Sequence, residues 1–125
     1  MGPVPVFIVE DSPHVQASLR EMLLSTGRFQ VVGAAESETD ATQWLMDARH
    51  PWSLAIVDLL LSEGSGFGVV QRCRSASPKG KIVVFSEFAT PAIKERCLKL
   101  GADAVFLKSE MSSMVAYVEQ LVATR

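Results

Sequence analysis

The chain has 125 residues, of which 48% are hydrophobic and 21% charged, and its formal net charge is −2. This length suits one domain with an adequate apolar core, so we expect a single domain over residues 1–125. The nearly balanced charge gives no general attraction to nucleic acid or to an anionic membrane. The sequence has no apolar run approaching the roughly 18 residues of a membrane span, and its first residues do not form a signal peptide. We therefore expect a cytoplasmic protein without nucleic-acid or membrane partners.

The chain has two cysteines, Cys73 and Cys97. Neither belongs to a CxxC motif or to a Cys/His cluster of the kind that binds metals. We expect two buried thiols in helices.

Short apolar runs rich in Val, Ile or Phe recur along the chain. Such near-continuous runs are typical of strands buried on both faces of a parallel sheet. The predicted strands are Val4–Val9, Val31–Ala35, Leu54–Val57, Lys81–Phe85 and Ala104–Leu107.

Helical patterns alternate with these strands. Ser12 and Pro13 offer an N-cap and a proline at the first helical position, and Gly27 closes the first helix. Thr90 and Pro91 open the fourth helix in the same way, and it ends before residue 101. The other predicted helices cover Thr39–Ala48, Gly66–Ala76 and Met111–Ala123. The inward stripe of the second helix is Ala41, Trp44, Leu45 and Ala48.

Five strands alternating with five helices predict a (βα)5 fold of the α/β class. Right-handed crossovers then place helices on both faces of an open, doubly wound parallel sheet. We expect the flavodoxin-like strand order 2-1-3-4-5, which brings strands 1 and 3 together at the topological switch point.

Polar residues follow four of the predicted strands. Glu10 and Asp11 follow strand 1, Asp58 ends strand 3, Ser86 follows strand 4 and Lys108 follows strand 5. The carboxyl ends of parallel strands meet at one edge, so these side chains should share one crevice. Three carboxylates there favour a hard cation such as Mg2+. One carboxylate can act as a nucleophile that forms an acyl phosphate, while the hydroxyl and ammonium groups bind phosphoryl oxygens.

Four segments of the chain resemble the receiver domain of two-component signalling systems. They are VEDS (Val9–Ser12), DLLLSEGSG (Asp58–Gly66), VVFS (Val83–Ser86) and GADAVFLKS (Gly101–Ser109). The resemblance covers almost the whole chain, and the motifs occur in the family's order.

This resemblance implies that Asp58 accepts the phosphoryl group, that Ser86 is the switch hydroxyl and that Lys108 pairs with the phosphoryl group. The implied Mg2+ ligands are the carboxylates of Glu10, Asp11 and Asp58 and the backbone carbonyl of Leu60. It further implies a signalling protein rather than an enzyme. A sensor histidine kinase or histidine phosphotransfer protein is the implied phosphodonor, and an output domain or partner is implied on the face formed by the fourth helix, fifth strand and fifth helix.

Several positions depart from the family's pattern. Ser62 and Ser109 replace prolines, and Glu87 stands where a small residue is usual. Val105 occupies the position of an aromatic switch residue, and Phe106 should face the opposite way because strand side chains alternate. The residues for phosphorylation are all present, whereas the output mechanism departs from the family's usual form.

Three other functions compete with this interpretation. Val105 and Glu87 leave open an interaction module that keeps the receiver fold but signals without phosphorylation. A haloacid-dehalogenase-type phosphotransferase also uses an aspartate and Mg2+, but it needs a second acid where this chain has Leu60. A flavin-binding flavodoxin is disfavoured because the turn after strand 1 is acidic and contains proline, which suits a phosphate poorly.

Two apolar residues predict a long-lived phosphorylated state. In the family, the residues two places beyond the phosphoacceptor and beyond the switch hydroxyl flank the approach of the hydrolytic water. Here they are Leu60 and Phe88, which cannot orient a water by hydrogen bonding. Glu87 could position water, but strand alternation should turn its side chain away from the site.

Overall fold

The computed structural model describes residues 2–123 as a parallel sheet of order β2-β1-β3-β4-β5, with helices between successive strands. The predicted (βα)5 flavodoxin-like fold is therefore confirmed. The elements in chain order are β1 (Val4–Val9), α1 (Pro13–Ser25), β2 (Phe29–Ala35), α2 (Glu38–Met46), β3 (Leu54–Val57), α3 (Gly66–Ala76), β4 (Lys81–Ser86), α4 (Pro91–Leu100), β5 (Ala104–Leu107), a short 3-10 helix η1 (Lys108–Glu110) and α5 (Met111–Ala123).

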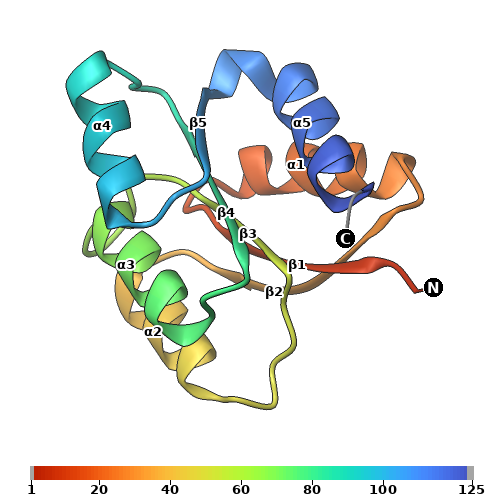
Figure 1. Ribbon diagram of the computed structural model, residues 1–125, viewed down its shortest axis with the longest axis horizontal. Helices are drawn as coiled ribbons and strands as arrows, with labels where there is room; N and C mark the ends of the chain where they lie inside the picture. The colour runs from red at the N-terminus through yellow and green to blue at the C-terminus, as the bar shows by residue number, and fades with distance from the viewer. Residues whose placement is uncertain (1, 124–125) are drawn as a thin grey trace.

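The helices cover the sheet in two layers, α1 and α5 on one face and α2, α3 and α4 on the other (Figure 1). The sheet is thus buried on both sides, which explains why its strands are almost uniformly apolar. Each face has its own core. Ile8, Ile56 and Phe85 pack toward α1 and α5, while Phe7 and Val84 pack toward the other three helices.

The helix starts follow the predicted capping residues. The Ser12 hydroxyl accepts a hydrogen bond from the Val15 N–H at 3.3 Å, and the Thr90 hydroxyl accepts one from the Ile93 N–H at 3.2 Å. Gly101 ends α4 in the left-handed conformation, with φ of 118°, which glycine adopts without strain. None of the helices within residues 2–123 is both long and apolar enough to cross a membrane.

The second helix ends earlier than predicted. It stops at Met46, and Asp47 adopts an extended conformation, so Ala48 lies outside the helix and is exposed. The inward position predicted for Ala48 is therefore wrong. The chain turns back instead: the His50 ring stacks on Trp44 at 4.4 Å, with its Nδ1 atom 2.7 Å from the Trp44 carbonyl oxygen. This local packing replaces another turn of helix.

Two strands are longer than the sequence indicated. The second begins at Phe29, which pairs with Val4, and the fourth extends to Ser86, which pairs with Leu107. The remaining strands have their predicted bounds.

Both cysteines lie in helices and are buried, as predicted. Burial raises the pKa of the Cys73 thiol to about 12. A thiol with this pKa is almost entirely protonated at neutral pH and is a poor nucleophile.

Candidate functional site

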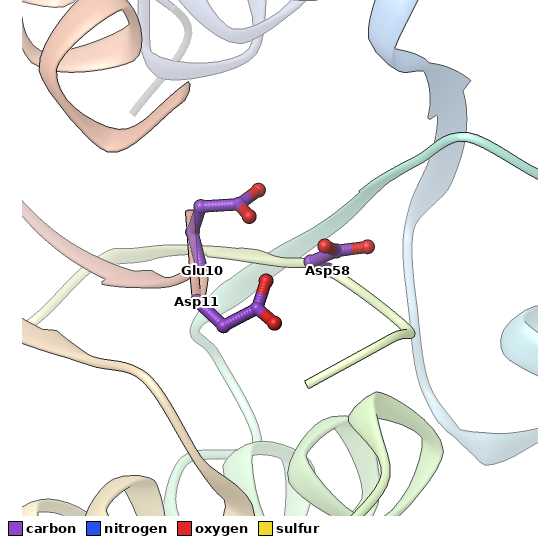
Figure 2. Close-up of side chains that lie close together, drawn as sticks. All are labelled: Glu10, Asp11 and Asp58. Atoms are coloured by element: carbon purple, nitrogen blue, oxygen red, sulfur yellow. The ribbon is translucent and has the colours of Figure 1, made fainter. Parts of the chain in front are cut away.

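The register of the central strands places two acidic residues side by side. Val9 of β1 pairs with Val57 of β3, and the Asp58 N–H donates to the Val9 carbonyl at 2.9 Å. Glu10 and Asp58 therefore leave neighbouring strands at the same level. Figure 2 shows Glu10, Asp11 and Asp58 gathered at this edge.

The three carboxylates form a compact acidic cluster. One oxygen from each of Glu10, Asp11 and Asp58 lies within 4.8 Å of the others. Glu10 is only 2% exposed and Asp58 only 4%, whereas Asp11 is half-buried. Oxygen atoms at this spacing are the donor set that a hard divalent cation prefers. The structure thus brings together the three acidic residues that the sequence singled out.

Lys108 bridges the two buried carboxylates. It begins η1 directly after β5, and its Nζ atom lies 2.9 Å from Glu10 Oε1 and 2.9 Å from Asp58 Oδ2. The Lys108 side chain is 17% exposed. One ammonium group therefore compensates two buried negative charges in part, and Asp11 adds a third beside them.

The pKa values of Glu10 and Lys108 are both shifted from their usual values, and burial is the largest single influence on each. It raises the pKa of the Glu10 carboxyl, and the charge of Asp58 raises it further, against hydrogen bonds from Lys108 and the Ser12 N–H. For Lys108, burial acts to lower the pKa, but hydrogen bonds and attraction to Asp58 and Glu10 outweigh it, so the pKa is raised. The cluster is therefore short of positive charge, which favours an added cation.

Ser86 lies at the carboxyl end of β4. It is fully buried and pairs with Leu107, the residue immediately before Lys108. Its hydroxyl accepts a hydrogen bond from the Phe88 N–H at 3.3 Å. The hydroxyl thus lies at the strand ends that carry the carboxylates and the lysine.

The loop after β3 is held against the phosphoacceptor candidate. The Leu60 N–H donates to Asp58 Oδ1 at 3.3 Å, and Leu60 forms an isolated antiparallel bridge with Ser65. A side chain at Gly66 would collide with the Asp58 carbonyl oxygen and the Leu59 backbone. Gly66 is therefore required for the close approach of α3 to this loop.

The same loop is fastened to the start of α2, which sequence reasoning did not foresee. Glu38 Oε1 accepts a hydrogen bond from the Ser65 N–H at 2.8 Å, and the Ser62 hydroxyl donates to the Glu36 carbonyl at 2.9 Å. The Ser62 N–H donates to that carbonyl as well, at 3.4 Å. A proline at position 62 has neither an N–H nor a hydroxyl and could not donate either hydrogen bond, so serine anchors the loop here in a way that proline could not. In the sequence, Glu38 looks like an ordinary acidic residue in a first helical turn.

Val105 and Phe106 face opposite sides of the sheet, as the alternation of strand side chains predicted. Val105 packs into the core beneath α2, α3 and α4, whereas Phe106 packs toward α5. The Phe106 ring lies 5.3 Å from the ring of Tyr117. Glu87 is exposed.

The chain belongs to the response regulator receiver domain family, which it matches over residues 6–119. Response regulators are chiefly signalling proteins of two-component systems. The fold and the acidic strand-end site are those expected for a receiver domain.

Relatives and solved structures agree with this assignment. The photosynthetic apparatus regulatory protein RegA of Rhodovulum sulfidophilum is 35% identical over 100 residues, which are 80% of this chain and 52% of that protein. The protein-glutamate methylesterase/protein-glutamine glutaminase 1 of Syntrophus aciditrophicus is 31% identical over 112 residues, 88% of this chain and 31% of that protein. The signal receiver domain of the putative response regulator NarL from Mycobacterium tuberculosis superposes with a TM-score of 0.85 at 25% identity, over the full length of both chains. The chain spans about half or less of these two curated relatives.

Proposed function

We propose that this receiver domain accepts a phosphoryl group on Asp58 and signals through the change in shape that follows. The observation that carries the proposal is the Lys108 ammonium 2.9 Å from both Asp58 and Glu10, with the Asp11 carboxylate in the same cluster. A buried carboxylate beside a cation-binding set and a fixed ammonium group is equipped for phosphoryl transfer.

Each residue of the site has a distinct task in this proposal. An Asp58 oxygen attacks the phosphorus of a phosphohistidine on a sensor kinase or phosphotransfer protein. The P–N bond breaks as the acyl phosphate P–O bond forms, and the electron pair stays on the imidazole. Lys108 then turns from the carboxylate to a phosphoryl oxygen, and the Ser86 hydroxyl donates a hydrogen bond to another phosphoryl oxygen.

The acidic cluster is the proposed Mg2+ site. Glu10, Asp11 and Asp58 supply carboxylate oxygens, and the Leu60 backbone carbonyl is the proposed fourth ligand. The ion, when bound, neutralises negative charge on the carboxylates and the incoming phosphoryl group.

The remaining proposals concern the cellular role. The chain acts as one signalling domain over residues 1–125 in the cytoplasm. Its own chemistry is limited to phosphorylation and self-dephosphorylation of Asp58. The α4-β5-α5 face carries the output, with no direct contact to nucleic acid or membrane. Val105, with one stiff torsion and little volume, reports the change only weakly.

The function is tested with a small acyl phosphate donor such as acetyl phosphate. The protein is incubated with the donor and with either Mg2+ or a chelator, and its intact mass is measured. We expect one acid-labile phosphoryl group in the Mg2+ sample, and none with the chelator or in Asp58→Asn. Equal labelling with and without Mg2+ would contradict the proposed site.

A phosphorylation-independent interaction module is the second candidate. It is favoured by the exposed Glu87 carboxylate, which adds negative charge directly after the switch serine, and by the absence of an aromatic side chain at Val105. This candidate predicts no labelling by acetyl phosphate, so the same experiment separates the two functions.

A further inference from the structure

An apolar cleft lies beside the proposed phosphorylation site. It shares Leu60 and Ser86 with that site, but the α4 residues and Phe67 that line it have no role in the chemistry above. Its volume is about 490 Å3. It lies between the loop after β3, the loop after β4 and the first turns of α4, and its lining includes Leu60, Phe67, Phe88, Ile93 and Arg96. A cleft of this volume falls within the range of about 300–1,000 Å3 that is typical of small-molecule sites.

The walls of this cleft expose large apolar side chains. Leu60 is 56% exposed and Phe88 is 54% exposed, while Phe67 and Ile93 are half-buried. Leaving such area in water is unfavourable, and an apolar group placed between these side chains would remove it from water.

The cleft also has one available positive charge. Arg96 is the only charged residue among those lining it in the part of the chain that the structure describes, and its guanidinium carbon lies 4.0 Å from the centre of the Phe67 ring. This cation–π contact orients the guanidinium group without neutralising it. Arg96 forms no ion pair with any described residue, whereas Lys99 on the next turn is paired with Glu95 at 3.0 Å.

We propose that this cleft binds a small amphiphilic anion, an apolar chain or ring that carries a single carboxylate. The apolar part occupies the space between Leu60, Phe88 and Ile93, and the carboxylate accepts hydrogen bonds from Arg96. Arg96 is one cation and therefore matches one negative charge, since the neighbouring Lys99 is already paired with Glu95. This favours a small molecule over an acidic protein segment.

The α4 residues that line the cleft lie on one flank of that helix. At 100° per residue, Ala92 and Arg96 lie on one flank of α4, and Lys94 and Leu98 lie roughly on the opposite flank. Lys94 is an exposed cation that does not line the cleft. It therefore serves as a matched control for Arg96.

Occupation of the cleft has a consequence for signalling that rests on the proposed function. Ser86, at the end of β4, lies in the lining together with Leu60, whose N–H donates to Asp58 Oδ1. A bound anion would hold the two loops in place over the phosphoryl group. Binding itself does not require phosphorylation and is tested without it.

The test uses octanoate, octanol and octylammonium, which share a chain length and differ in charge. Each is titrated into the unphosphorylated full chain while backbone amide chemical shifts are recorded. We expect octanoate to give saturable shifts centred on the cleft and to bind roughly tenfold more tightly than octanol, with octylammonium weakest. Arg96→Gln should abolish the preference for octanoate over octanol, Lys94→Gln should retain it, and Phe88→Ala should weaken both ligands.

Several results would overturn the proposal. They are chemical-shift changes scattered over the surface, equal affinity of the wild type for octanoate and octanol, or an equal loss of the octanoate preference in Arg96→Gln and Lys94→Gln. Because the titration uses unphosphorylated protein, a failure of phosphorylation leaves its outcome unaffected, so the two hypotheses fail separately.

Discussion

Replacing Lys108 by methionine should destabilise the protein strongly when no divalent cation is present. The variant keeps an unbranched side chain but removes the ammonium group that lies 2.9 Å from both Glu10 and Asp58. These carboxylates are 2% and 4% exposed, so water cannot replace the lost partner fully. Removing one partner of a buried ion pair costs about 3–5 kcal/mol, and we expect about 3 kcal/mol because the Lys108 side chain keeps some contact with solvent.

Mg2+ should then reduce this loss. Without the competing ammonium group the acidic cluster should bind the ion more tightly, and each tenfold gain in affinity adds about 1.4 kcal/mol to the stability at saturating metal. The assay is urea denaturation of wild type and Lys108→Met in a chelator and in Mg2+, with the exposed Lys94→Met as the control. A loss of stability for Lys108→Met in the chelator no larger than that for Lys94→Met would refute the prediction. If the stability difference between wild type and Lys108→Met is larger in Mg2+ than in the chelator, Lys108 helps to hold the ion.

Three further predictions follow from local geometry. Gly66→Ala should cost about 1–3 kcal/mol in urea denaturation and impair labelling by acetyl phosphate, because its methyl group would collide with the Asp58 backbone carbonyl oxygen; unchanged labelling would show that the loop tolerates the shift. Arg74→Met should cost about 2–4 kcal/mol, because the guanidinium group donates to four backbone carbonyls, whereas the exposed control Arg49→Met should leave the stability nearly unchanged; equal losses of stability in the two variants would contradict this. Leu60→Asn with Phe88→Glu should shorten the phosphorylated lifetime, measured by loss of the phosphoryl group in saturating Mg2+, and an unchanged lifetime would rule out apolar shielding.

The strand-end site was predictable because it depends on topology more than on detail. Once the order 2-1-3-4-5 is inferred from the alternation of strands and helices, residues that end the strands must meet at one edge. Glu10, Asp11 and Asp58 follow from that rule alone. Capping by Ser12 and Thr90 was equally accessible, because it is encoded within a few residues of each helix start.

The parts that escaped prediction depend on packing between distant segments. Lys108 was expected in the same crevice as Glu10, but their direct contact joins residues 98 positions apart, and no local pattern predicts it. The hydrogen bond from the Ser65 N–H to Glu38 Oε1 likewise joins residues 27 positions apart, and no local pattern predicts it. Ala48 was misplaced because the apolar helical pattern continues past Met46, where the helix ends. The chain turns back there, and the His50 ring stacks on Trp44.

The central claim is that Asp58 is the phosphorylated residue, and the most direct measurement is the position of the phosphoryl group in the wild-type chain. The protein is labelled with acetyl phosphate in Mg2+, the acyl phosphate is reduced with borohydride, and the modified peptide is sequenced by mass spectrometry. We predict conversion of Asp58 to homoserine with Glu10 and Asp11 unmodified. Modification at either of those residues, or on a serine, would contradict the account.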